Sequence, residues 1–132
     1  MNTNIAGEEP KPLSLEVKVE KLIYRLGEEV KIDINLTNKS TETLEVTELA
    51  IDRRSLFIQI IQPDRQTNKL LAIYGLKLKN IRLYAGQTVN FKTNFIPQIV
   101  GEHQIKVSYN GFQDLTIVAA SRKIFVVYPA KK

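Results

Sequence analysis

The sequence predicts an all-β protein in which two antiparallel sheets pack into a sandwich of about seven to nine strands. Three observations lead to this prediction. Apolar residues recur at every second position in several runs, which is the period of a strand with one buried face. Clusters of turn-forming residues separate these runs at short intervals. No window of a dozen residues holds an apolar stripe at helical spacing, so we expect almost no helix.

Two alternating runs open the predicted sandwich. Over residues 13–19, leucine and valine alternate with polar residues. The second run, over residues 30–37, is more regular and places four apolar residues on one face: Val30, Ile32, Ile34 and Leu36. The segment "TNKSTET" at 37–43 then supplies the residues of a turn. Each run predicts a strand with one face in the core and one face in water.

Two later runs alternate in the same way. The first presents Val89, Phe91, Thr93 and Phe95 on one face, and the second presents His103, Ile105, Val107 and Tyr109. The segments "PDRQTNK" at 63–69 and "PQIVGE" at 97–102 supply further turns. Because the chain's one histidine shares the parity of three core residues, we expect it to be buried and hydrogen-bonded as a structural residue.

Two runs carry apolar residues on both faces. The first run is "LFIQII" at 56–61, in which Phe57 and Ile61 lie on the side opposite Leu56. The second is "KIFVVY" at 123–128, in which Phe125 and Val127 lie on the side opposite Ile124. The apolar segment "KLLAIYGLKL" at 69–78 either covers these outward side chains or leaves them as an exposed contact surface. In the second case four residues are candidates for binding a partner: Phe57, Ile61, Phe125 and Val127.

One short phrase occurs twice, as "YRLGEEV" from residue 24 and as "YAGQTV" from residue 84. In both places a tyrosine leads to a glycine, and an alternating strand follows. We interpret the phrase as a recurring turn in which the glycine adopts positive φ, with an internal duplication as the alternative.

Two longer segments carry a resemblance to a known class of domain: "YRLGEEVKIDINLTNKS" at 24–40 and "PQIVGEHQIKVSY" at 97–109. They resemble strand signatures of the immunoglobulin-like β-sandwich domains of bacterial surface and multidomain proteins. The resemblance spans residues 13–128 and implies Greek-key connections and a binding role. His103 stands where that pattern usually has a tyrosine. Related patterns occur in arrestin-like folds, transglutaminase-type accessory domains and a bacterial intracellular proteinase-inhibitor family.

Composition bounds the organisation of the chain. Its 132 residues suit one domain, which we place at 13–128, with a polar leader or linker at 1–12 and a tail at 129–132. No apolar run is long enough to span a membrane, so we expect no membrane insertion. The absence of cysteine excludes disulfides and thiolate chemistry but does not decide between an extracytoplasmic and a cytoplasmic location.

The sequence gives no support for an enzyme. No serine lies in a G-x-S-x-G motif, no glycine-rich phosphate loop occurs, and a single histidine with no cysteine cannot supply a typical metal site. The adjacent acids Glu8 with Glu9 and Glu28 with Glu29 fall in a tail and a turn. We therefore expect no catalytic residues, no metal and no cofactor.

Charge is distributed unevenly along the chain. Residues 1–48 hold ten acids and six bases, whereas residues 49–132 hold four acids and thirteen bases. Seven bases gather where Asp52 and Asp64 are the only acids, and they are candidates for binding a partner: Arg53, Arg54, Arg65, Lys69, Lys77, Lys79 and Arg82. An anionic polysaccharide would suit such a patch. Nucleic acid is disfavoured because only Tyr74 and Tyr84 could stack on bases and no recognition motif is present.

These observations favour a non-catalytic interaction module, one domain of a bacterial extracytoplasmic or multidomain protein, whose partner is another protein or a neighbouring domain. Two alternatives remain open. One is a peptidase inhibitor that presents the loop 63–69 with Arg65 and Lys69, and the other is a structural spacer.

Overall fold

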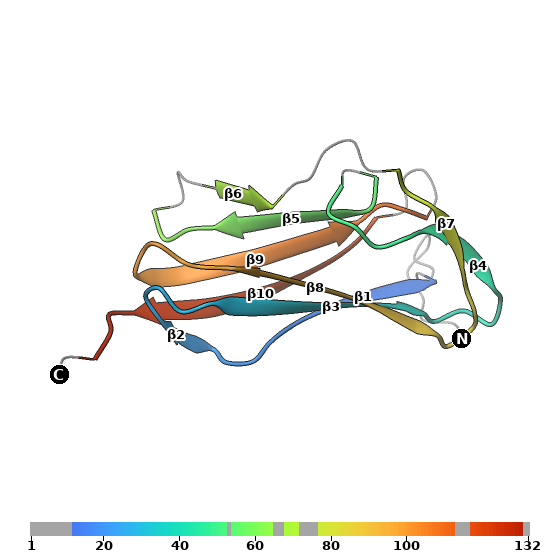
Figure 1. The fold of residues 1–132 in the computed structure, drawn as a ribbon. Coiled ribbons are helices and arrows are strands. Elements are labelled where there is room, and N and C mark those ends of the chain that lie inside the picture. Colours follow the sequence, from blue (N-terminus) through green and yellow to red (C-terminus); the bar gives the residue numbers. More distant parts are fainter. Residues whose placement is uncertain (1–11, 53, 65–67, 72–76, 113–116, 131–132) are drawn as a thin grey trace, which may run out of the picture.

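The computed structural model describes residues 12–130 except 53, 65–67, 72–76 and 113–116 (Figure 1). The described residues contain no helix and form ten strands: β1 (Leu13–Val19), β2 (Ile23–Arg25), β3 (Val30–Asn38), β4 (Leu44–Thr47), β5 (Leu56–Ile61), β6 (Asn68–Leu71), β7 (Asn80–Leu83), β8 (Thr88–Phe95), β9 (Gly101–Tyr109) and β10 (Val118–Val127).

The strands form two main sheets that pack as layers (Figure 1). One sheet has the order β1-β3-β8 and the other the order β2-β10-β9-β5-β6, while β4 and β7 form a short separate pair. Strands that neighbour one another are often distant in sequence, so the chain crosses between the layers as Greek-key connections require. The prediction of an all-β, immunoglobulin-like antiparallel sandwich is confirmed.

Two details of the strand pattern differ from the expectation. The described residues hold ten strands, more than the seven to nine predicted, and the short ones are β2 with three residues and β4, β6 and β7 with four. Segments of this length are too short to display an alternating pattern. In addition, β2 pairs parallel to β10, whereas the other named strand pairs are antiparallel.

The core lies between the inner faces of the two sheets. The four apolar residues expected on the inner face of β3, and Ile105, Val107 and Tyr109 of β9, are each at most 2% exposed. Burial of one such side chain contributes about 1.5–3 kcal/mol relative to leaving it in water. The alternation predicted for both strands is therefore confirmed, and β3 and β9 are the central strands of their sheets.

His103 belongs to this core, as expected. Its side chain is fully buried, and the Gly101 carbonyl oxygen accepts a hydrogen bond from Nδ1 at 3.1 Å. Its ring centroid lies 6.4 Å from that of Phe95 on β8, so the imidazole packs between the two sheets. These contacts hold the imidazole in the core through Nδ1, whereas Nε2 is buried with no hydrogen-bond partner among the described residues.

Tyr109 joins the short pair β4-β7 to the core. Its side chain is fully buried, and its hydroxyl donates a hydrogen bond to the carbonyl oxygen of Thr47 at the end of β4. Burial raises the pKa of the phenol, so the donor remains protonated at neutral pH. A Cβ at Gly111 would meet this hydroxyl at 2.5 Å, so the chain after β9 passes closely over Tyr109.

The repeated phrase builds the same turn twice. Gly27 has φ 88° and Gly86 has φ 77°, the positive values expected. In the first turn the N–H of Glu28 donates to the carbonyl oxygen of Arg25 at 2.9 Å, and in the second the N–H of Gln87 donates to that of Tyr84 at 2.9 Å. Both arrangements match a type II turn, which requires positive φ at its third residue.

A side chain closes each of these turns. Glu28 Oε1 accepts from the backbone N–H of Arg25 at 3.0 Å, and Gln87 Oε1 accepts from that of Tyr84 at 2.8 Å. The equivalent segments are thus 25–28 and 84–87, and the two tyrosines of the phrase are not equivalent, since Tyr24 is buried and Tyr84 exposed. The shared feature is a glycine followed by Glu or Gln.

Substitution of Ile34 by alanine should lower the free energy of unfolding by about 2–5 kcal/mol, because it leaves a cavity between the sheets. Urea unfolding followed by circular dichroism would measure the change. Lys31→Ala, at an exposed position of the same strand, should change stability by less than about 0.5 kcal/mol. Equal effects of the two substitutions would contradict the assignment of β3 as the centre of the core.

Replacement of Gly27 or Gly86 by alanine should cost about 1–2 kcal/mol each, because a residue with a Cβ disfavours positive φ. A Cβ at either position meets no atom within 4 Å, so the loss would report backbone conformation alone. Asparagine tolerates this conformation better, and Gly27→Asn should cost less than Gly27→Ala in thermal unfolding. Equal costs for the two would show that φ is not the constraint.

Candidate functional site

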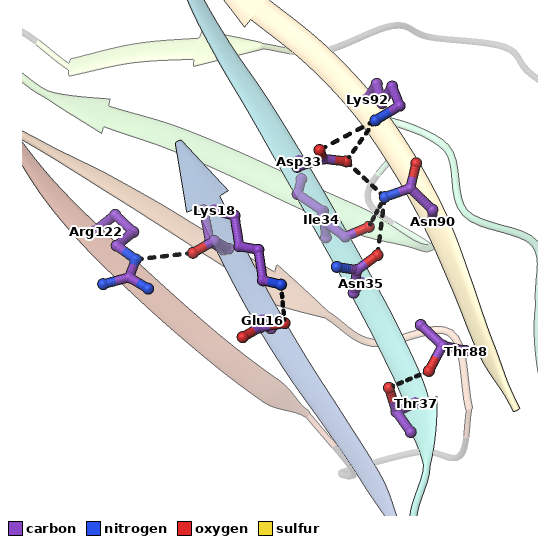
Figure 2. Close-up of polar contacts among 11 residues, drawn as sticks. Glu16, Lys18, Asp33, Ile34, Asn35, Thr37, Thr88, Asn90, Lys92 and Arg122 are labelled. Carbon is purple, nitrogen blue, oxygen red and sulfur yellow. Dashed lines mark hydrogen bonds and ion pairs between the residues drawn. The ribbon is translucent and has the colours of Figure 1, made fainter. Parts of the chain in front are cut away.

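The outer face of the three-stranded sheet is entirely polar. Figure 2 shows how its side chains bond to one another across β3 and β8. The hydroxyls of Thr37 and Thr88 lie 2.7 Å apart, and the Asn90 amide donates to Asn35 Oδ1 at 2.8 Å and to Asp33 Oδ1 at 2.6 Å. The residues that point outward are Ser14, Glu16, Lys18, Lys31, Asp33, Asn35, Thr37, Thr88, Asn90, Lys92 and Asn94.

The charges on this polar face are largely matched. Lys92 Nζ lies 2.9 Å from Asp33 Oδ1, and Lys18 Nζ lies 3.6 Å from Glu16 Oε1. The hydrogen bond from Asn90, followed by that from Lys92, lowers the pKa of the Asp33 carboxyl. A hollow of about 420 Å³ lies beside Lys18, Lys31, Asp33 and Lys92. Because most of these groups already have protein partners, the face offers little to a ligand.

The outer face of the five-stranded sheet has a different character. Phe57 on β5 is 39% exposed, and Phe125 and Val127 on β10 are 47% and 42% exposed. Ile23 on β2, which pairs with Phe125, is 60% exposed. Leu22 and Tyr128, beside the same strand ends, are also exposed. Exposed apolar side chains therefore gather on one of the two faces.

The predicted apolar residues do not form a single patch. Phe57 lies in a row with Ser108 and Ala119 at one end of the sheet, whereas Phe125 lies six residues further along β10. At the usual rise of a strand these two ends are about 20 Å apart. Ile61 lies between them and is half-buried. Ile23, which extends the Phe125 end, was not predicted, because its strand is too short to show a pattern.

Whether residues 69–78 cover the outward apolar side chains of β5 and β10 depends mainly on residues that the structure does not describe. Residues 72–76 lie outside the described residues, and of residues 69–71 only the backbone, in β6, is described. The prediction therefore stays open for that segment. Phe57, Phe125 and Val127 nevertheless keep more than a third of their surface accessible.

Two hollows lie on the outer face of the five-stranded sheet. One, of about 420 Å³, is lined by Phe57, Lys106, Ser108, Ala119 and Ser121, and it forms where small side chains stand beside a phenylalanine and a lysine. The other, of about 600 Å³, is lined by Ile61, Gln62, Pro63, Glu102, Gln104 and Lys123. Among the described residues, neither Lys106 nor Lys123 has a carboxylate within 4 Å.

The seven predicted basic residues do not share one environment. Arg53 and Arg65 lie outside the described residues, and only the backbone of Lys69, in β6, is described. Arg54 is bound to Asp52, with Nε and a terminal nitrogen each 3.1 Å from its carboxylate oxygens. The remaining three are exposed on or just before β7: Lys77, Lys79 and Arg82.

Carboxylates from β4 and from the residue that follows it lie among the bases at β7. Glu45 is the cross-strand partner of Arg82, and Glu48 Oε1 accepts a hydrogen bond from the backbone N–H of Lys79 at 3.0 Å. Glu45 and Glu48 precede the basic stretch in sequence, so the count of charges along the chain assigned them to the acidic part, residues 1–48, and not to the neighbourhood of these bases. This neighbourhood weakens the case for an anionic polymer at β7.

Chemistry-bearing side chains are sparse in the described parts of the chain. Nowhere among them do three or more acidic or histidine side chains gather in a way that could hold a metal ion. Ser55, which is buried, donates its hydroxyl to the carbonyl oxygen of Glu48 at 2.7 Å.

In the part of the chain that the structure describes, no helix could cross a membrane.

Known structures show where this fold recurs. The CARDB domain of the PF1109 protein from Pyrococcus furiosus, solved in complex with di-metal ions, has a TM-score of 0.61 and 13% identity over 89% of this chain and 94% of that domain. Spo0M, a sporulation control protein from Bacillus subtilis, has a TM-score of 0.58 and 18% identity over 89% of this chain. The alkylpurine DNA glycosylase AlkC from Pseudomonas fluorescens has a TM-score of 0.56 and 13% identity over 88% of this chain.

This chain spans 50% of Spo0M and 30% of AlkC, so the same fold forms one part of those longer proteins. No protein-family model matches the chain, and no curated protein is detectably similar to it in sequence. Likeness at such low identity shows the fold alone, so what this chain shares with these proteins is the architecture of its β-sandwich.

The Asp33 carboxyl should titrate below the value of about 3.9 for an unstructured aspartate. Its ionised form accepts the bonds from Asn90 and Lys92, so this contribution to stability is present above about pH 4 and is lost as the pH falls through the lower folded-state pKa. Carboxyl carbon NMR would measure the midpoint. Asn90→Ala should raise it while leaving that of Asp52, which bonds to Arg54, unchanged.

Proposed function

We propose that this chain is a non-catalytic binding module that holds a protein partner on the outer face of its five-stranded sheet. The difference between the two outer faces is the observation that supports this proposal. One face is polar and bonded to itself, and the other exposes Phe57, Phe125, Val127 and Ile23. Exposed apolar groups of this kind are what a protein interface removes from water.

A partner that docks on either outer face removes water from the side chains of that face. A partner on the polar face would displace water from Asp33, Asn35 and Asn90 without offering them better bonds, because they already bond to one another. A partner on the other face would bury aromatic and aliphatic side chains, at about 25 cal/mol per Å² of apolar area. Docking is therefore more favourable on the five-stranded sheet.

The rigid framework suits this role. The side chains on the outer face alternate with fully buried ones, such as Ile58, Ile60 and Ile124, so their backbone positions are fixed by the core. A binding surface fixed in this way loses little conformational entropy when a partner docks. The competing functions, a peptidase inhibitor acting through loop 63–69 and a spacer, make no use of this surface.

Selection of random peptides displayed on phage against the immobilised domain would test the proposal. Backbone amide NMR shifts caused by the selected peptides should map to β5, β9, β10 and β2. The double variant Phe57→Glu/Phe125→Glu should bind them at least about tenfold more weakly, a loss of about 1.4 kcal/mol. The matched control, Thr37→Glu/Asn94→Glu on the polar face, should bind normally.

Two results would overturn the proposal. Shifts confined to β1, β3 and β8 would place binding on the wrong face. Inhibition of trypsin-like enzymes by the domain, lost on replacement of Arg65, would favour the peptidase inhibitor instead.

A further inference from the structure

The outer face of the five-stranded sheet is organised in rows that run across its strands. The pairing of β5, β9 and β10 sets four successive rows: Phe57 with Ser108 and Ala119, then Gln59 with Lys106 and Ser121, then Ile61 with Gln104 and Lys123, then Glu102 with Phe125 and Ile23. Successive rows are two residues apart along each strand, which corresponds to about 7 Å.

The chemical character of the side chains changes from row to row. A hollow of about 420 Å³ spans the first and second rows, beside Phe57 and Lys106. The second and third rows hold the ammonium groups of Lys106 and Lys123, which have no carboxylate within 4 Å among the described residues. The fourth row presents the exposed side chains of Phe125 and Ile23. The order is therefore apolar, cationic, cationic, apolar.

We infer that this face binds an extended acidic segment of a partner protein, in which residues at positions 1, 3, 5 and 7 are apolar, acidic, acidic and apolar. The inference rests on the proposed function and names the partner's chemistry. In an extended segment every second side chain points the same way, at a spacing of about 7 Å. Four such side chains match the four rows one to one.

The path of the segment is oblique to the strands. Its first contact lies beside β5 and β9, Lys106 is on β9, Lys123 is on β10, and the last contact joins β10 to β2. Strands that pack on a sheet face commonly cross the underlying strands at about 30°. The positions of the two lysines thus agree with the ordinary geometry of a strand laid on a sheet.

Glu102 fixes the register of the segment. It is the cross-strand neighbour of Phe125 in the fourth row, so a partner carboxylate at position 7 would meet a like charge, whereas an apolar residue would not. A segment shifted by one row toward Phe125 would bring an acid against Glu102 and leave Lys106 without an acidic partner. Arg25, opposite Val127, lies one row further on and outside the segment.

Charge distinguishes the occupant from a second copy of this chain. The charged groups described on this face are Lys106, Lys123, Arg25 and Glu102, so two copies face to face would bring together surfaces that are both net positive. An acidic segment has the complementary charge. Polyanions share this charge but lack the two apolar groups about 20 Å apart that the end rows would receive.

The test is a charge exchange with defined peptides. The fluorescein-labelled peptide Leu-Ser-Glu-Ser-Glu-Ser-Leu, with blocked ends, should bind the domain in a fluorescence anisotropy titration. The same peptide with lysine in place of both glutamates should bind at least about tenfold more weakly. The double variant Lys106→Glu/Lys123→Glu should reverse this preference. The control Lys18→Glu/Lys31→Glu, on the polar face, should keep it.

Register is tested separately. The peptide Leu-Glu-Ser-Glu-Ser-Ser-Leu has the same composition but places its acids at positions 2 and 4, and it should bind about as weakly as the lysine peptide. Equal binding of the two acidic peptides, or a preference that the lysine reversal does not change, would overturn the inference. So would tighter binding of heparin or of a single-stranded oligonucleotide at the same lysines.

Failure of this inference can be separated from failure of the proposed function. If phage-selected peptides map to the five-stranded face but lack the acidic pattern, and the defined peptide does not bind, the inference falls and the binding role stands. If no selected peptide maps to that face, both fall.

Discussion

The period of two along β3 and β9 is the constraint on which the rest of the molecule depends. Each strand lies in the middle of its sheet, and its inward side chains are almost completely removed from water. A slip of one residue in β3 would turn Lys31 and Asp33 into the core and expose Ile32 and Ile34, so the register has no close competitor. The outer faces are consequently fixed as well, because they consist of the alternate positions.

Much of this architecture could be predicted from the sequence, because alternation is a local property. The burial of Ile34 and His103 and the positive φ of Gly27 and Gly86 all follow from residues a few positions away. The parallel pairing of β2 with β10 could not be predicted, since three residues carry no period and their partner is about a hundred positions distant. The hydrogen bonds by which Glu28 and Gln87 close the two turns were not predicted either.

The candidate surface was predicted in part. Parity alone showed that Phe57, Phe125 and Val127 point away from the core, and all three are exposed. Parity could not show that Phe57 is separated from the other two, nor that Glu45 lies beside Arg82, because both facts depend on which strands become neighbours. Strand order is a long-range property, and it turns a list of outward residues into a surface with rows.

The parallel pair formed by β2 and β10 has a mechanical consequence. Once β1 has been pulled away from β3, a force applied to both ends of the sandwich would draw β2 toward its amino end and β10 toward its carboxyl end. Because these strands run in the same direction, the force would act along both of them, and the contacts from Ile23 to Arg25 would have to rupture together. Antiparallel neighbours loaded at one end would unzip one bond at a time. The smallest strand in the sheet would therefore serve as a clamp against stretching.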